Sequence, residues 1–358
     1  MIDRVLRQCD GLRKASRFRE ALLCYKRYLK GCRQKGNKEG ELFCLLSMGD
    51  TFRIMGRFND ALKTYKESAS IARVLRDDRS LADAMIGIGL SYRGLCDWRQ
   101  ALKYIERAKT SYNHLGDREG IAFSQWAEAG TLRIKGDIKK ALELAKKAKA
   151  FFESKSDKSG TGYCLCAMGG LSRIIGRFDE SLAYYSEANS IFKDIKDRFG
   201  RAYSFCGIGN ALRMKNELEE AMKYLRKAES IYKTIGDIVS YSYTLWSMGM
   251  VCIIKGEGNL ARGLLKKAFK NFDKTGDLRG VIYFLLSMAE LAIIKGHLLR
   301  AEKYLSDALG LSKEKGFTLE KLHSELIMRY LKKGIIDNNL YRSSGIRLRF
   351  DSFPFNIP

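Results

Sequence analysis

Arginine recurs every 40 residues through the first 213 residues of this sequence, and its spacing is the clearest sign of ligand chemistry. The series consists of Arg13, Arg53, Arg93, Arg133, Arg173 and Arg213. A guanidinium group is planar and always charged, so it forms paired hydrogen bonds with carboxylates or phosphates. The series therefore predicts a surface that binds anionic groups.

Aromatic residues repeat in phase with the arginines. In the same 40-residue register stand Tyr163, Tyr203, Tyr243 and Tyr283, together with Trp126 and Trp246. Within each repeat the tyrosine, tryptophan and arginine positions and one further position are spaced by three, four and three residues, which places them on one face of a helix. Rings beside guanidinium groups suit a partner that carries both acidic and apolar groups.

The residue type at this further position distinguishes the early repeats from the later ones. Along the chain it holds Asp10, Asp50, Leu90, Gly130, Gly170, Asn210, Met250 and Glu290. We expect Asp10, Asp50 and Asp83 to neutralise the first three arginines. We call the helix face formed by these four positions the stripe. The middle arginines have no acid on their stripe and are the stronger candidates for ligand contact.

Two interpretations of the stripe remain open. Its arginines either contact a partner or form hydrogen bonds within the protein, and its aromatic residues either contact a partner or pack between helices. The residues predicted to contact a partner are Arg53, Arg93, Arg133, Arg173, Arg213, Trp126, Tyr163, Tyr203, Asn210, Tyr243, Trp246 and Tyr283.

Signals for catalysis are poor. The histidines His114, His297 and His323 have no nucleophile or metal ligand at motif spacing, and neither a phosphate-binding loop nor a nucleophile elbow occurs. Cys164 and Cys166 would point in different directions on one helix, and two thiols are too few for a typical metal site. We expect no enzyme activity, no cofactor and no metal.

A sequence repeat identifies the helices that position the stripe. Blocks of 40 residues align without insertion or deletion through residue 320. Small residues stand at position 9 in Cys9, Gly49, Gly89, Ala129, Gly169, Gly209, Gly249 and Ala289, and at position 21 in Ala21, Ala61, Ala101, Ala141, Ser181, Ala221, Ala261 and Ala301. Each block reads as two helices, at block positions 1–15 and 17–35, that approach closely at these small residues. Position 16 separates them and is glycine except in Ser16, Cys96 and Asn216, and pairs such as Gly116-Asp117 end the second helix.

These residues resemble the tetratricopeptide repeat. The third block carries the spacing of Met85, Ile88, Gly89 and Tyr92, followed by Ala101, Ile105 and Ala108. The 40-residue length is similar to the long-repeat subgroup of kinesin light chains and polarity adaptors. The family's proline late in the second helix is replaced by the Gly-Asp turn. The resemblance implies an all-α, right-handed solenoid in which the first helix of each repeat lines a concave groove and each repeat contacts only its neighbours.

The sequence divides into three parts. Residues 1–320 form eight repeats, 321–334 read as a capping helix, and 335–358 form a non-helical tail. The end of this tail, IRLRFDSFPFNIP, is rich in phenylalanine. We expect it to fold back onto blocks seven and eight, to fill the same site of a second molecule, or to cover the terminal helix as a lid.

Composition sets the expected environment. The chain has 65 Lys and Arg against 41 Asp and Glu, a net charge of +24, which favours anionic partners. It shows no secretory signal and no apolar run long enough for a membrane span. Nine cysteines without framework spacing suit free thiols in a reducing compartment, so we expect a cytoplasmic protein.

The resulting expectation is a non-catalytic interaction scaffold or adaptor. Its concave groove would bind an acidic and apolar segment of a protein or peptide partner. The alternative is a single-stranded RNA- or DNA-binding protein in which the arginines hold phosphates and the aromatic rings stack on bases. The partner's identity and the oligomeric state stay open at this stage.

Overall fold

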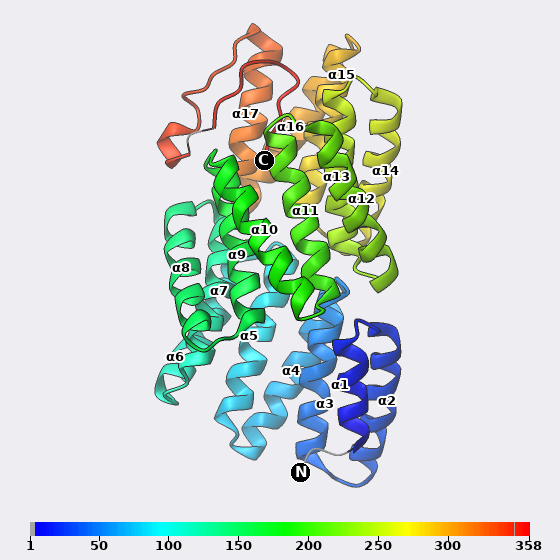
Figure 1. Cartoon of the computed structure of the whole chain (residues 1–358), viewed down its shortest axis with the longest axis vertical. Helices are drawn as coiled ribbons and strands as arrows, with labels where there is room; N and C mark the ends of the chain where they lie inside the picture. Colours follow the sequence, from blue (N-terminus) through cyan, green and yellow to red (C-terminus); the bar gives the residue numbers. More distant parts are fainter. Residues whose placement is uncertain (1–3, 347) are drawn as a thin grey trace.

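The computed structural model describes residues 4–346 and 348–358, and these residues form 17 α-helices and no strand (Figure 1). The helices are α1 (Arg4–Lys14), α2 (Phe18–Gln34), α3 (Lys38–Ile54), α4 (Phe58–Leu75), α5 (Asp78–Gly94), α6 (Trp98–His114), α7 (Arg118–Lys135), α8 (Ile138–Ser154), α9 (Lys158–Ile174), α10 (Phe178–Asp194), α11 (Arg198–Met214), α12 (Leu218–Ile235), α13 (Ile238–Ile254), α14 (Gly258–Thr275), α15 (Leu278–Ile294), α16 (Leu298–Lys315) and α17 (Thr318–Lys333). The all-α solenoid expected from the repeat is confirmed.

Backbone conformation explains why the helices end where they do. A residue with positive φ stands at block position 16, in Ser16, Gly56, Cys96, Gly136, Gly176, Asn216, Gly256 and Gly296. A second stands 20 residues later, in Gly36, Arg76, Gly116, Ser156, Lys196, Gly236, Gly276 and Gly316. A left-handed residue stops the helix and turns the chain, and glycine adopts it without steric cost. The predicted turn positions are therefore confirmed, although side chains other than glycine occupy several of them.

The odd-numbered helices begin earlier than the sequence predicts. From α3 onward each starts three residues before its 40-residue block does. The reason is the residue after the turn, for example Asp117 or Asp157, whose carboxylate accepts the backbone N–H three residues along. Such a cap satisfies an N–H that the first turn of a helix leaves unpaired. The aspartate of each Gly-Asp pair thus begins the next helix.

Small residues bring the two helices of a repeat together, as expected. A Cβ added to Gly209 of α11 would lie 3.0 Å from the backbone oxygen of Ala221 in α12. The alanines at position 21 are completely buried, as Ala221 and Ala261 illustrate. Close approach lets the helix pairs stack and bury apolar side chains between them, in several clusters along the solenoid.

The solenoid closes on itself, so the expectation that each repeat contacts only its neighbours is wrong. Trp98 Nε1 donates to the carbonyl of Lys315 at 3.0 Å, and Thr318 Oγ1 donates to the carbonyl of Lys135 at 2.8 Å. Between them Cys96 Sγ lies 3.4 Å from Asp277 Oδ1. We call these six residues the seam. It joins the third and fourth repeats to the turns that flank α15 and α17, because the superhelix completes a turn within this distance along the chain.

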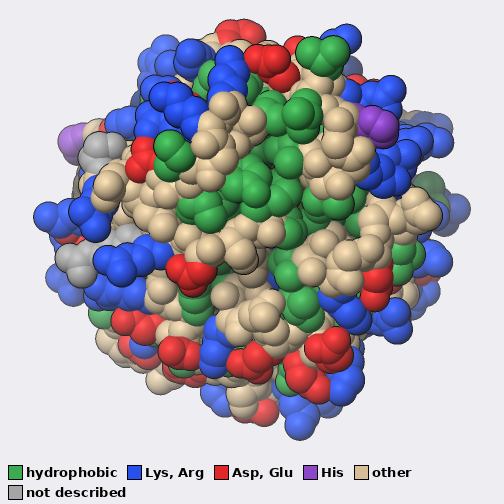
Figure 2. Space-filling model, turned by 90° about the horizontal axis from the view of Figure 1, so that it is seen from above, with side chains coloured by type: hydrophobic (Ala, Val, Ile, Leu, Met, Phe, Trp, Pro, Cys, Tyr) green, Lys and Arg blue, Asp and Glu red, His purple; other side chains and the backbone are tan. Residues whose placement is uncertain are grey.

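Among the described residues after α17 there is no α-helix, and the segment folds back over the body of the molecule. It contains one short 3₁₀ turn, Arg342–Ser344, and buries Phe350, Phe355 and Ile357. Phe353 stacks on Tyr330 of α17 with ring centroids 4.6 Å apart. Figure 2 shows this end of the molecule, where apolar side chains gather in the centre and Lys and Arg lie around the edge. The predicted fold-back is therefore observed within one chain.

Two further observations concern the chain's environment. Cys9 and Cys24 form a disulfide between α1 and α2, so the expectation of nine free thiols is wrong for this pair. The two positions face each other within one helical hairpin, a proximity that sequence spacing alone does not reveal. The other seven cysteines are free. Among the described residues, no helix is both long and apolar enough to span a membrane.

Candidate functional site

The odd-numbered helices carry the predicted stripe, and side chains from it line two separate cavities. One has a volume of about 170 Å³, and we call it the arginine cavity. The other has a volume of about 300 Å³, and we call it the acidic cavity. The arginine cavity is lined by Arg133, Arg173, Ile174, Tyr185, Tyr203, Cys206, Gly207, Asn210, Tyr232, Ser240, Tyr243, Trp246, Ser247, Arg279, Tyr283 and Pro358.

The arginine cavity brings cationic side chains together without an acidic side chain among its lining residues. Arg133 from α7 and Arg173 from α9 are half-buried, and no carboxylate side chain lines the cavity with them. Within the described part of the chain neither arginine forms an ion pair, and the buried Arg173 Nε has no hydrogen-bond partner. Arg279 differs because Glu320 neutralises it. Two guanidinium groups are thus free to bind an anionic ligand.

Electrostatic repulsion within the series of arginines contributes to lowered pKa values of two of its members, Arg213 and Arg93. Burial and, to a smaller extent, the charge of Arg173 lower the pKa of Arg213 to about 9. Burial likewise lowers the pKa of Arg93 to about 10, with contributions from Arg53 and Arg133. A ligand carboxylate or phosphate in the arginine cavity would relieve this repulsion.

The early arginines have partners within the protein. Asp10 lies 3.8 Å from Arg13, and Asp50 lies 3.5 Å from Arg53, so these two predicted ion pairs are confirmed. Arg53 lines neither cavity.

The third predicted pair is wrong. Asp83 lies 3.5 Å from Arg79, one turn earlier on its own helix, and accepts the Tyr112 hydroxyl at 2.6 Å. Arg93 instead lies over the Trp126 ring, 5.2 Å from its centroid. Asp83 and Arg93 are ten residues apart on α5, which separates them by nearly three helical turns.

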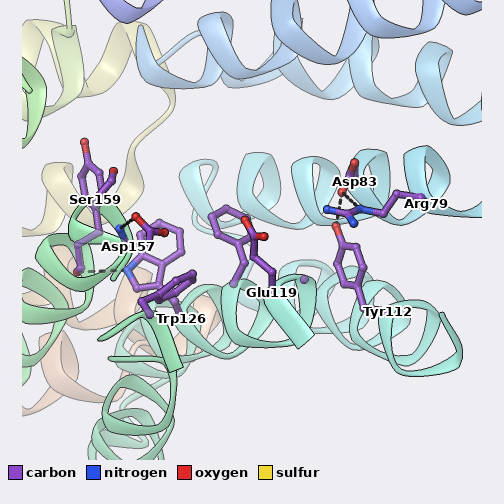
Figure 3. Close-up of a pocket in the computed structure, with 12 residues that line it drawn as sticks. Arg79, Asp83, Tyr112, Glu119, Trp126, Asp157 and Ser159 are labelled. Atoms are coloured by element: carbon purple, nitrogen blue, oxygen red, sulfur yellow. Dashed lines mark hydrogen bonds and ion pairs between the residues drawn. The ribbon is translucent and has the colours of Figure 1, made fainter. Parts of the chain in front are cut away.

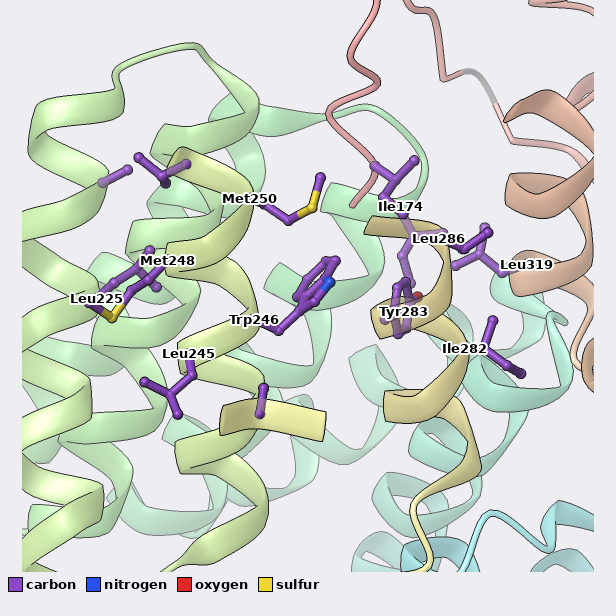
Figure 4. Close-up of a cluster of buried hydrophobic side chains, with 14 of the residues drawn as sticks. Ile174, Leu225, Leu245, Trp246, Met248, Met250, Ile282, Tyr283, Leu286 and Leu319 are labelled. Carbon is purple, nitrogen blue, oxygen red and sulfur yellow. The ribbon is translucent and has the colours of Figure 1, made fainter. Parts of the chain in front are cut away.

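The aromatic members of the stripe divide between the two cavities. Tyr203, Tyr243, Tyr283 and Trp246 line the arginine cavity, and Figure 4 shows Trp246 and Tyr283 facing each other between α13 and α15. Several also serve packing: the Tyr243 hydroxyl donates to Asp277 at 3.1 Å, and Trp246 Nε1 donates to Ser287 at 2.9 Å. Packing within the protein is thus observed for these rings, and their contact with a partner stays a prediction.

The acidic cavity was not predicted. Asp83, Glu119 and Asp157 lie around it, with Trp126 and Tyr163 forming part of its wall (Figure 3). Trp126 Nε1 donates to the backbone oxygen of Tyr163 at 3.3 Å. Glu119 and Asp157 stand at helix starts, outside the stripe that guided the sequence analysis. Carboxylates beside aromatic faces suit a cationic side chain.

The tail contacts Arg213, the last arginine of the series. The sequence did not predict this contact either. Arg213 Nη2 donates to the carbonyl of Ile357 at 2.9 Å, and Arg213 Nη1 donates to Asn356 Oδ1. Pro358 forms part of the wall of the arginine cavity. Asn210 also contacts Arg213, since its Oδ1 accepts from Arg213 Nη2 at 3.2 Å while its Nδ2 donates to the carbonyl of Cys206.

Comparison with solved structures finds similar folds over nearly the whole chain. A Rap protein complexed with competence and sporulation factor has a TM-score of 0.61 at 12% identity, covering 95% of this chain and 98% of that one. NprR in complex with its cognate peptide NprX has a TM-score of 0.59 at 16% identity, covering 92% and 99%. The Rap conjugation regulator of plasmid pLS20 in complex with the Phr* peptide has a TM-score of 0.55 at 14% identity, covering 86% and 98%. At these identities the likeness concerns the fold alone.

Sequence comparison agrees with the fold. No curated protein sequence matches the chain. Residues 163–234 match the tetratricopeptide repeat family. The same two-helix unit, with the same turn positions, recurs from α1 to α16. The match shows a tetratricopeptide repeat segment at residues 163–234, and the structure repeats the same two-helix unit along the described chain.

Proposed function

We propose that the chain is a non-catalytic scaffold that binds an extended segment of a protein or peptide partner in its groove. Arg133 and Arg173 would hold an acidic group of that segment, and Tyr203, Trp246 and Tyr283 would contact its apolar part. The observation that carries the proposal is the arginine cavity, where two half-buried guanidinium groups face open space and no acidic side chain is among the lining residues. A ligand carboxylate there would form charge-assisted hydrogen bonds away from bulk water.

The similar structures support a peptide as the partner. Those of the Rap and NprR proteins contain competence and sporulation factor, the Phr* peptide or NprX. The series of arginines also differs from a nucleic-acid surface, because Arg13 and Arg53 are paired with acids and Arg213 is buried. A continuous basic track, as phosphate backbones require, is therefore interrupted. The cytoplasmic location expected from the sequence stays a prediction.

The experiment compares acidic and neutral ligands. Fluorescein-labelled octapeptides carrying one glutamate among leucine and tyrosine residues are titrated against the full chain, beside matched peptides with glutamine. We expect the best glutamate peptide to bind about tenfold or more tightly than its glutamine match, since hydrogen bonds between charged groups contribute more than neutral ones. Equal affinities for every pair would contradict the proposal.

Two double variants locate the effect. Arg133→Gln with Arg173→Gln should remove the preference for glutamate. Lys146→Gln with Lys147→Gln, two exposed positions on α8, removes the same charge outside the groove and should leave the preference intact. Titration with a labelled oligothymidine tests the alternative: tight binding with a log–log salt slope of about −4 would favour single-stranded nucleic acid.

A further inference from the structure

The end of the tail is held by the groove through its backbone and one side chain. The Phe355 N–H donates to Glu290 Oε1 at 2.9 Å, and the Ile357 carbonyl accepts from Arg213 at 2.9 Å. Between them Asn356 uses both ends of its amide: Oδ1 accepts from Arg213 Nη1, and Nδ2 donates to the Arg213 carbonyl at 2.6 Å. The side chains of Phe355 and Ile357 are buried.

This contact differs from the rest of the tail. Residues such as Phe350 and Phe353 pack on Tyr341 and Tyr330 by ring contacts, which suffices for an apolar cover over α17. The Phe355 ring belongs to the same aromatic cover, but segment 355–357 also forms hydrogen bonds with two side chains on distant helices, Arg213 of α11 and Glu290 of α15. The tail therefore consists of a cover followed by a segment bound as a peptide ligand would be.

Burying the side chains of Arg213 and Glu290 costs free energy, and a tail that only covers α17 would require neither of them. Arg213 is fully buried, and its guanidinium donates hydrogen bonds to Asn210 Oδ1 and to the Ile357 carbonyl of the tail. Burial raises the pKa of Glu290 to about 8, an effect that the Phe355 N–H and the charge of Arg213 partly offset. Glu290 Oε2 has no hydrogen-bond partner in the described residues. Apolar side chains would line a simple packing surface more favourably than a buried guanidinium and a buried carboxyl group.

We propose that Arg213, Asn210 and Glu290 form a binding site for an extended peptide in which asparagine stands between two apolar residues. Segment 355–357 is an internal copy of that ligand, and a partner with the same pattern binds by displacing it. The proposal rests on the proposed function, since the site adjoins the arginine cavity at Pro358. Figure 4 shows the C-terminal ribbon beside the cluster around Trp246, Met250 and Tyr283.

The geometry of the site explains why the central residue of the bound segment is asparagine. The site presents a guanidinium donor and a backbone carbonyl acceptor to the same side chain. A primary amide accepts with its oxygen and donates with its nitrogen, whereas an ionised aspartate cannot donate and leucine can do neither. Because the internal copy is tethered, it competes at an effective concentration on the order of millimolar. An external partner must therefore be abundant, or must gain further contacts in the neighbouring cavity.

The test uses the full chain and a labelled hexapeptide with the sequence of residues 353–358, blocked at both ends. Wild-type protein should bind it weakly because the tail occupies the site. Asn356→Ala leaves the groove unchanged but removes two hydrogen bonds from the tail, so we expect about tenfold or tighter binding of the peptide. Equal affinity in wild type and Asn356→Ala would overturn the proposal.

Asn338 provides a matched control. Its amide also makes two backbone hydrogen bonds, to the N–H and the carbonyl of Phe350, but it lies outside the site. Asn338→Ala should therefore raise peptide affinity far less than Asn356→Ala does. Equal gains from both would mean that general loosening of the tail, and not release of the site, causes the effect.

Changes in the peptide test its chemistry without altering the protein's fold. In the Asn356→Ala protein, replacing the peptide's asparagine by leucine or aspartate should cost about tenfold or more in affinity. Unchanged affinity would overturn the assignment of asparagine. The hexapeptide has no acidic group, so this outcome is independent of the glutamate preference that tests the proposed function.

Discussion

At the scale of single residues, burial decides which ionisable groups respond to pH. His323 of α17 is fully buried, with Nδ1 2.7 Å from the Tyr341 hydroxyl and no partner for Nε2 in the described residues. Burial and the charge of Arg279 lower its pKa from 6.5 to about 3. The folded protein thus holds this histidine neutral where the unfolded chain would protonate it.

Acid should therefore destabilise the protein through His323. Between pH 6.5 and about 3 the unfolded chain binds a proton here that the folded chain does not, so stability falls as pH falls. Relative to His323→Gln, wild type should lose at most about 1.4 kcal/mol per pH unit in its free energy of unfolding. Urea titrations at pH 6.5 and 4.5 measure this difference.

The comparison between variants removes opposing contributions. Burial raises the pKa of Glu290 to about 8 and of Asp237 to about 6, so both groups favour the folded state as pH falls. They are present in wild type and variant alike and cancel in the difference. His114→Gln, at an exposed position, should behave like wild type. The same acid response in wild type and His323→Gln would show that this histidine is not the sensitive group.

At the scale of the helices, contact between the two members of a pair depends on residues without a side chain. An added Cβ at Gly209 would lie 2.7 Å from Leu225 Cγ and 3.0 Å from the Ala221 backbone oxygen, and the backbone cannot move aside freely. Gly310 lies inside α16 with nothing within 4 Å of such a Cβ. The same substitution should therefore have opposite effects at the two positions.

We expect Gly209→Ala to lower the free energy of unfolding by about 1–3 kcal/mol, because the helices must separate to admit the methyl group. Gly310→Ala should raise it by about 0.5–1 kcal/mol, because alanine restricts the unfolded chain and favours helix. Urea unfolding followed by circular dichroism measures both. Stabilisation by Gly209→Ala would mean that α11 and α12 do not pack as closely as the structure shows.

At the scale of the whole molecule, the seam converts an open solenoid into a closed one. In a purely nearest-neighbour array, repeats unfold in segments and the transition broadens. Hydrogen bonds from Trp98 and Thr318 connect repeats about 180–220 residues apart in sequence, which couples the third and fourth repeats to the C-terminal end. The seam also restricts how the groove can open.

Loss of the seam should therefore reduce cooperativity and expand the molecule. We expect Trp98→Ala combined with Thr318→Ala to increase the radius of gyration in X-ray scattering and to lower the urea m-value, since segments would unfold separately. Leu299→Ala, at a position 86% exposed on α16, is the control and should change neither. Unchanged scattering and an unchanged m-value in the double variant would show that the seam does not hold the solenoid closed.

Local patterns in the sequence determined the repeat, the helix pairs, their turns and the small residues between them. These features depend on residues close together in the chain, such as Gly209 and Ala221, or on a single backbone conformation, such as that of Gly116. The stripe of arginines and aromatic residues follows from the same helical periodicity. For the same reason the ion pairs of Asp10 and Asp50, each three residues from its arginine, were predictable.

Only the tertiary structure decided how these elements meet over long distances. The seam, the acidic cavity and the contact of Asn356 with Arg213 depend on the rotation that accumulates from repeat to repeat, and a difference of a few degrees per repeat would separate them. The Cys9–Cys24 disulfide and the pairing of Asp83 with Arg79 depend on side-chain direction within and between helices. Periodicity specifies which face of a helix a residue occupies, but the packing of whole helices determines what lies opposite that face.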